Sequence, residues 1–176
     1  IIASGAIPVS DPFLLDRIIS LAESKECQPI LCINKWDLVQ AEDLLAIYQA
    51  AGIPTLSVSA ATGQGIEELR GLLAGKISAF TGNSGVGKSS LINRVEPGLS
   101  LKIAEISDSH DTGKHTTTFA EMFPLSFGGS IIDTPGIRAF GLIHMEKAEI
   151  SHYFPEIFKR AEDCRFYNCT HIHEPG

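Results

Sequence analysis

The sequence predicts an α/β fold in which helices cover both faces of a largely parallel sheet. Short apolar runs of strand length alternate along the 176 residues with segments whose apolar residues recur at helical spacing. A glycine-rich turn, residues 82–87, falls directly between a predicted strand and a predicted helix. Hydrophobic residues make up 44% of the chain and charged residues 20%, which is the usual balance for a globular domain with its own core.

The predicted elements follow one another with short connections. Apolar residues at positions 13, 14, 15, 18, 19 and 22 predict the first helix, and Gly52 is placed to end the second. Gly128 and Gly129 are expected to form the turn between the last two strands. In chain order, the strands are expected at 1–5, 30–33, 55–58, 77–80, 119–125 and 130–132, and the helices at 12–23, 41–51, 66–73 and 88–94.

Two further stretches have a different character. Residues 96–118 are polar and without a clear period, which favours a functional loop over core structure. From Ile137 the pattern becomes helical and aromatic, so we expect a domain boundary near residue 140. Cys27 and Cys32 flank an apolar stretch, and we expect both to be buried as small apolar side chains.

Residues 82–89 fit the phosphate-loop pattern G-x-x-x-x-G-K-S completely. Glycines allow backbone N–H groups to turn toward a phosphate, and the helix that follows directs the positive end of its dipole at the anion. Lys88 is expected at the β- and γ-phosphates and the Ser89 hydroxyl on Mg²⁺. A glycine-rich turn without a ligand is the weaker alternative, because strand and helix are both predicted in place. The residues expected around the phosphates are Gly82, Asn83, Ser84, Gly85, Val86, Gly87, Lys88, Ser89 and Ser90.

The run Asn34-Lys35-Trp36-Asp37 indicates a guanine clamp. The Asp37 carboxylate can accept hydrogen bonds from the N1–H and 2-amino groups of guanine, and adenine offers neither donor. Asn34 is expected to tie this loop to the phosphate loop, and the Lys35 stem to cover the base. The backbone N–H groups of Ser59 and Ala60, at the next strand end, are expected at the guanine O6. The alternative is a polar strand-to-helix turn.

The run Asp133-Thr134-Pro135-Gly136 indicates the magnesium side of such a site. Asp133 is expected to hold Mg²⁺ through water, and the Gly136 N–H to meet the γ-phosphate; the alternative is a plain turn. In ordinary GTPases the guanine motif follows the phosphate loop, whereas here it comes first. The motifs together therefore predict a circularly permuted P-loop GTPase.

The loop at 113–118, Gly-Lys-His-Thr-Thr-Thr, lies where a first switch belongs. A threonine there can complete the Mg²⁺ shell, although an exposed polar loop is also compatible with the pattern. Ile137 follows Gly136, where many GTPases carry a glutamine that orients the attacking water. Intrinsic hydrolysis is therefore expected to be slow unless another group positions the water. His115 is the nearby candidate, and a hydrogen bond within its own loop is the equal alternative.

Near the end of the chain, Cys164, Cys169 and His171 have the donor types of a tetrahedral zinc site, with His173 as a possible fourth ligand. Two ordinary cysteines beside exposed histidines remain an alternative. The net charge of −7 argues against a general nucleic-acid binder, and no apolar run approaches the ~20 residues of a membrane span.

Taken together, the permuted motif order, Gly-Lys-His-Thr-Thr-Thr and the Cys/His tail resemble the ribosome small subunit-dependent GTPases, the RsgA/YjeQ family. The resemblance covers essentially the whole chain and includes Phe154-Pro155-Glu156. It implies a cytoplasmic, monomeric GTP hydrolase with GTP or GDP, Mg²⁺ and Zn²⁺ as ligands. Such a protein acts late in maturation of the small ribosomal subunit, is stimulated by that subunit, and has no membrane partner.

The resemblance also implies residue roles and missing parts. His115 would be catalytic, Thr117 would be the magnesium-side threonine, and Cys164, Cys169 and His171 would bind zinc with a cysteine that falls after residue 176. It implies a GTPase domain at 1–140 and the start of an incomplete zinc-binding domain at 141–176. The N-terminal OB-fold, which would supply the main rRNA contact, is absent from this chain, as its start within a predicted strand also suggests.

Two other functions stay open. One is a permuted GTPase that acts on the large ribosomal subunit, which the His-Thr-Thr-Thr run and the Cys/His tail disfavour. The other is a nucleotide-gated binding module whose hydrolysis serves only as a reset, a reading that Ile137 supports.

Overall fold

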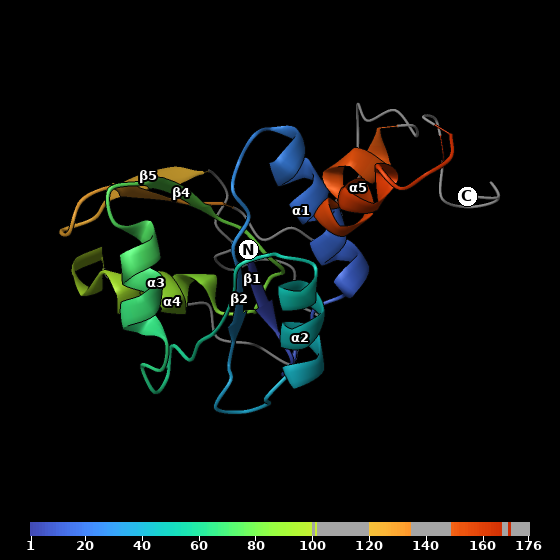
Figure 1. The fold of residues 1–176 in the computed structure, drawn as a ribbon. Helices are drawn as coiled ribbons and strands as arrows, with labels where there is room; N and C mark the ends of the chain where they lie inside the picture. The colour runs from blue at the N-terminus through green and yellow to red at the C-terminus, as the bar shows by residue number, and fades with distance from the viewer. Residues whose placement is uncertain (100, 102–119, 135–148, 167–168, 170–176) are drawn as a thin grey trace.

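The structure is a computed structural model, and it describes residues 1–99, 101, 120–134, 149–166 and 169. Its strands form two three-stranded sheets, with orders β1-β2-β3 and β4-β6-β5. The Ile2 N–H donates to the Thr81 carbonyl at 2.7 Å, which joins β1 to the end of β4 and sets the two sheets side by side (Figure 1). The strands are β1 (Ile2–Ser4), β2 (Leu31–Asn34), β3 (Thr55–Ser57), β4 (Ile77–Phe80), β5 (Glu121–Pro124) and β6 (Ser130–Asp133).

The strand directions confirm the predicted parallel sheet, with one exception. β1, β2 and β3 pair in parallel, as do β4 and β6, whereas β5 runs antiparallel to β6. A tight turn joins β5 to β6, in which the Gly128 N–H donates to the Leu125 carbonyl and the Leu125 N–H to the Gly129 carbonyl, both at 3.0 Å. Both glycines have a φ of +89°, a conformation that favours glycine, so the predicted Gly-Gly turn is confirmed.

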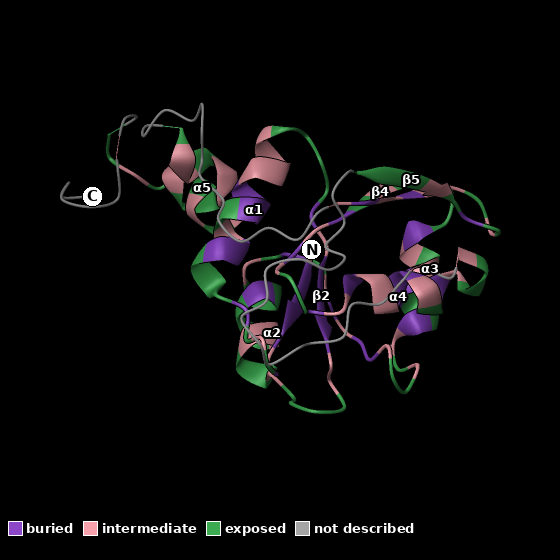
Figure 2. Cartoon of the chain, turned by 180° about the vertical axis from the view of Figure 1, so that it is seen from behind, coloured by how far each residue is buried: buried purple, intermediate pink, exposed green. Residues whose placement is uncertain are grey.

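Helices cover both faces of the β1-β2-β3 sheet, because successive strand residues point to opposite sides. Ile2 and Cys32 face a core shared with the helices α3 and α4, whereas Ala3 and Ile33 face a second core built with α1 and α2. Figure 2 shows the strands buried between these layers. The helices are α1 (Pro12–Ser24), α2 (Glu42–Ala50), α3 (Ile66–Leu73), α4 (Lys88–Val95) and α5 (Pro155–Ala161), with 3-10 turns η1 (Pro97–Leu99) and η2 (Ile150–Tyr153).

The bounds of α3 and β4 are those that the sequence predicts, and the other helices and strands up to residue 95 differ by one residue at one or both ends, whereas η1 falls where the sequence predicts a loop. The predicted burial of Cys27 is wrong. α1 ends at Ser24, so Cys27 lies in the exposed turn that follows, whereas Cys32 lies within β2 and is buried as expected. None of the helices in the described part of the chain combines the length and the apolar content needed to cross a membrane.

A core prediction follows from the position of Leu91, which is fully buried on α4 between the sheet and α3. We expect Leu91→Ala to lower the free energy of unfolding by about 2–5 kcal/mol, because it leaves a cavity that the packed helix cannot close. Urea denaturation followed by circular dichroism measures the change. Ile47→Ala on α2 is the control, since Ile47 is 61% exposed. Equal unfolding midpoints for the two variants would contradict this packing.

Candidate nucleotide-binding site

The described residues of the guanine motif, the phosphate loop and the end of β6 lie at one edge of the structure, where the parallel strands end. Asn34 is the last residue of β2, and Asp133 is the last residue of β6. The phosphate loop leaves β4 at Phe80, which pairs in register with Asp133. Ligands of open α/β sheets bind at the carboxyl ends of the strands, so this edge is the candidate site.

The phosphate loop has the backbone of an anion cradle. Gly82, Gly85 and Gly87 have φ angles of +148°, +81° and +96°, a region that side chains disfavour. Space excludes side chains as well, because a Cβ on Gly82 would collide with the Ile2 carbonyl and one on Gly87 with the Asn34 amide. The loop therefore needs glycine at these positions, and the concave run of amides that it forms fits a phosphate.

Lys88 fills the cradle from the first turn of α4. Its ammonium donates to the carbonyls of Gly82 and Asn83, both at 2.9 Å, and the residue is 8% exposed. Burial lowers the pKa of Lys88, and the nearby Asp133 carboxylate opposes that shift. A bound phosphate would supply further negative charge and stabilise the charged ammonium, so Lys88 is suited to bind an anion.

The amino end of α4 faces the same loop. Its N-cap, Gly87, has no side chain that could accept hydrogen bonds from the first turn. Those N–H groups and the helix dipole are thus available to an anion. Within the described residues, the buried Oδ1 of Asn83 has no hydrogen-bond partner in the protein, which is the state expected of a group that water or a ligand satisfies.

Asn34 joins the guanine motif to the phosphate loop, as the sequence predicts. Its Nδ2 donates to the Val86 carbonyl at 2.9 Å, and its Oδ1 accepts from the Ala60 N–H at 3.1 Å. The side chain is 2% exposed, so the bond to Val86 is shielded from water and the bond from Ala60 is partly shielded. One amide thereby connects the loops that follow β2, β3 and β4.

Asp37 is oriented by a contact that the sequence analysis missed. The Ser59 hydroxyl donates to Asp37 Oδ1 and accepts from the Thr62 N–H at 3.1 Å. The Ser59 N–H donates to the Gln64 carbonyl, and the Ala60 N–H is held by Asn34, so both amides expected at the guanine O6 have protein acceptors in this structure. Ser59 therefore contacts the guanine motif through its hydroxyl. The sequence signal for this contact is that Ser59, a polar residue, follows the strand next to the one that ends at the guanine motif.

Lys35 has an unusual backbone and an unexpected partner. Its φ of +60° is left-handed, which is uncommon for a residue with a side chain. Its ammonium donates at 2.6 Å to the carbonyl of Ile7, which lies in the loop after β1. Partial burial lowers the pKa of this lysine. The side chain thus spans the region between the guanine motif and that loop.

The magnesium-side residues are only partly described. Asp133 is 4% exposed, and the Thr134 hydroxyl donates to the Phe80 carbonyl at 2.6 Å, which holds the end of β6 against β4. A carboxylate and the Ser89 hydroxyl are oxygen donors of the kind that Mg²⁺ prefers, so these residues fit the ion. Their predicted companions His115, Thr117 and Gly136 lie outside the described residues.

The zinc prediction is not tested by the described residues. Cys164 and Cys169 are half-buried in the segment after α5, and His171 lies outside the described part. No group of three or more histidine, cysteine or acidic side chains suited to a metal is found among the residues that the structure describes.

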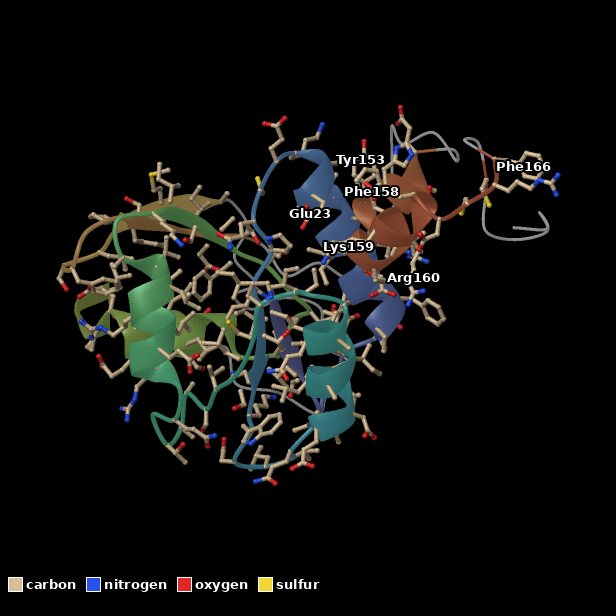
Figure 3. All side chains as sticks on the ribbon, viewed as in Figure 1. Glu23, Tyr153, Phe158, Lys159, Arg160 and Phe166 are labelled. Atoms are coloured by element: carbon tan, nitrogen blue, oxygen red, sulfur yellow. The ribbon has the colours of Figure 1, made fainter. Side chains whose placement is uncertain are left out.

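A separate open cavity, of about 390 Å³, lies at the opposite edge, near the amino ends of β2 and β3. Its lining includes Glu23, Glu26 and Pro155, so it carries carboxylates where a phosphate site would need donors. Figure 3 shows Glu23 at the end of α1 and the side chains of Lys159 and Phe158 on the neighbouring α5. The cavity is thus not a second candidate for the nucleotide.

The comparison with known families agrees with this geometry. The sequence matches the profile of the RsgA GTPase over residues 1–143, which is most of the chain. The chain belongs to the RsgA GTPase family. The predicted membership is thereby confirmed, and so is the predicted permuted fold, which the solved structures below share.

Relatives in the RsgA family cover 96% of the chain at 46–49% identity. The chain is 49% identical over 178 aligned positions to the small ribosomal subunit biogenesis GTPase RsgA of Porphyromonas gingivalis, covering 96% of this chain and 56% of that protein. The protein of the same name from Bacteroides fragilis is 46% identical over 175 positions with the same coverage. The chain therefore spans little more than half the length of these relatives.

Two solved structures have the same fold. The crystal structure of YjeQ from Thermotoga maritima matches with a TM-score of 0.75 and 36% identity, over 99% of this chain and 59% of that one. The structure of YloQ, described as a circularly permuted GTPase, matches with a TM-score of 0.72 and 30% identity, over 98% and 55%. The RsgA fold of this chain is therefore the permuted GTPase fold.

A prediction follows from the position of Asn34 between three loops. We expect Asn34→Ala to lower the free energy of unfolding by about 1–3 kcal/mol, because it leaves the buried Val86 carbonyl and Ala60 N–H without their partner. Urea denaturation measures the loss. Gln64→Ala truncates an exposed amide in an adjacent loop and serves as the matched control. An Asn34→Ala protein as stable as the control would show that these bonds do not join the loops.

Proposed function

We propose that this chain is the GTP-hydrolysing core of a factor that acts in biogenesis of the small ribosomal subunit. The observation that carries the proposal is the double contact of Asn34, which places the guanine motif beside the phosphate loop in one site. The names of the relatives from P. gingivalis and B. fragilis support the cellular role.

Guanine selectivity rests on the orientation of Asp37. Its carboxylate is held from one side by the Ser59 hydroxyl, which leaves further acceptor capacity for the N1–H and 2-amino groups of the base. Adenine has neither donor and would leave the carboxylate unpaired, so adenine nucleotides should bind much more weakly. Lys35 would lie along the base, with its ammonium anchored beyond it on Ile7.

Phosphate binding and charge stabilisation come from the loop and its lysine. The amides of the phosphate loop and the amino end of α4 would hold the β-phosphate, and Lys88 would neutralise charge that develops on the β- and γ-oxygens. Ser89 and Asp133, with Thr117, would hold Mg²⁺, which supplies charge neutralisation at the phosphates. Water would attack the γ-phosphorus of GTP and the bond to the bridging oxygen would break, which gives GDP as the leaving group and inorganic phosphate.

Activation of the water is assigned to His115 by residue type and position in the sequence. Ile137 stands where many GTPases have a glutamine, and an alkyl side chain cannot orient water. We expect low intrinsic turnover that rises when the ribosomal subunit brings His115 to the attacking water. Ile137 equally favours the second candidate, a nucleotide-gated binding module whose slow hydrolysis only resets it.

The partners follow from the relatives and from charge. The net charge of −7 makes this chain by itself a poor ligand for RNA, so the rRNA contacts are assigned to the family's OB-fold. Zn²⁺ is proposed at Cys164, Cys169 and His171, whose donor types suit it. The proposed protein is a cytoplasmic monomer.

The proposal predicts GTP hydrolysis that depends on the ribosome. With purified small subunits, we expect the full-length protein to hydrolyse GTP roughly 10-fold faster or more, because a positioned His115 completes the catalytic set. Lys88→Ala should lower the stimulated rate by about 100-fold or more, because it removes the buried donor to the phosphates. Phosphate release measures both effects.

Lys76→Ala, an exposed lysine at the start of the strand that feeds the phosphate loop, is the matched control and should keep the wild-type rate. Undiminished turnover of Lys88→Ala would refute the assignment of the phosphate loop. Tight guanine binding with no stimulation by small subunits, and with single-turnover rates that stay slow, would favour the nucleotide-gated module instead.

A further inference from the structure

The connection between β1 and α1, residues 5–10, is closed by buried hydrogen bonds at its two ends. The Ser4 N–H donates to the Ser10 hydroxyl at 2.9 Å, and the Ser10 N–H donates to the Ser4 carbonyl at 2.9 Å. Ser4 is fully buried and Ser10 is 6% exposed, so water does not compete for these bonds. We refer to residues 5–10 as the β1–α1 loop.

A second set of contacts shapes the start of this loop. The Ser4 hydroxyl donates to the Ala6 carbonyl at 3.0 Å, in addition to its contact with the Ala6 N–H at 3.1 Å. A Cβ on Gly5 would lie 2.8 Å from the Ala41 Cβ, so the chain passes closely over the segment that follows the guanine motif. The loop is therefore fixed against the site rather than held only at its ends.

The middle of the β1–α1 loop touches both halves of the nucleotide site. The Ile7 carbonyl accepts from the Lys35 ammonium at 2.6 Å. The ring of Pro8 lies against the phosphate loop, because a Cβ on Gly85 would be 3.3 Å from its Cδ and 3.4 Å from its Cγ. A single short loop thus contacts the guanine motif through one residue and the phosphate loop through the next.

Lys35 is the residue that most needs such support. Its left-handed φ of +60° stores strain that persists only where neighbours fix the conformation. A free lysine side chain also loses considerable rotamer entropy when it becomes ordered over a ligand. A carbonyl that holds the ammonium beforehand removes much of that loss from the binding step, which is the effect of pre-organisation.

We infer that the β1–α1 loop is a positioning element of the nucleotide site, in which Ser10 holds Ile7 and Pro8 in place, the Ile7 carbonyl fixes Lys35 along the base, and Pro8 restrains the phosphate loop. The loop thereby slows the release of guanine nucleotide. This inference rests on the proposed function, since it assumes that the site binds guanine nucleotide. Ser10 acts through Ile7 and Pro8 and touches no ligand itself.

The test is the dissociation rate of a fluorescent methylanthraniloyl derivative of GDP from the full-length protein. We expect Ser10→Ala to raise this rate about 5–10-fold, the size of effect that follows from the lost order of one long side chain. Ser20→Ala is the matched control. Ser20 is an equally buried serine whose hydroxyl donates to the Asp16 carbonyl within α1, away from the site, and its variant should keep the wild-type rate.

A double-mutant cycle separates positioning from a general loss of stability. Lys35→Met keeps the stem but cannot bond to Ile7, so it should raise the rate, and the double variant should be no faster than Ser10→Ala alone. Effects of Ser10→Ala and Lys35→Met that multiply would overturn the inference, because the two residues would then act independently.

Pro8→Ala is a second variant that keeps the inference testable if the Ser10→Ala protein does not fold, since Pro8 is only half-buried. It should also speed dissociation, and wild-type rates in Pro8→Ala would overturn the role of the loop. If the wild-type protein binds no guanine nucleotide at all, the proposed function fails, and the inference fails with it. If the wild-type protein binds guanine nucleotide but all variants keep its dissociation rate, the inference fails and the proposed function stands.

Discussion

The pair of hydrogen bonds made by the buried Asn34 side chain is the interaction on which the site depends. Val86, its acceptor in the phosphate loop, lies 52 residues away along the chain, and Ala60, its donor, lies 26 residues away. The sheet makes this meeting possible, because β2 and β4 end at the same edge. One amide then fixes the spacing between the loop expected to bind the base and the loop expected to bind the phosphates. Recognition of both ends of one nucleotide requires that spacing to be constant.

The order of the strands in the sheet, and not the order of the motifs along the chain, decides which motifs meet in the site. The guanine motif precedes the phosphate loop here, yet the Ile2–Thr81 hydrogen bond sets β1 beside β4 and brings the early strands next to the later ones. This sheet order places the β1–α1 loop against Lys35 and Gly85. A segment near the start of the chain therefore forms part of the wall of the site.

The sequence was sufficient for elements and motifs whose signals are local. The amphipathic spacing of residues 66–73 predicts α3, and the glycines of residues 82–87 predict the phosphate loop, because backbone conformation at those positions depends on the residues themselves. The Ser59–Asp37 and Lys35–Ile7 contacts could not be predicted, since they depend on how separate strand ends are placed in space. Cys27 was misplaced because an apolar run beside it does not reveal where a helix ends.

The measurement that tests the central claim most directly is the affinity of the full-length protein for GDP and for ADP, determined by calorimetry under the same conditions. If the guanine motif and the phosphate loop form one site, GDP should bind roughly 1000-fold more tightly than ADP or better, because ADP leaves the Asp37 carboxylate unpaired. Comparable affinities for the two nucleotides would contradict the account, since the phosphate loop would then bind without the guanine motif taking part.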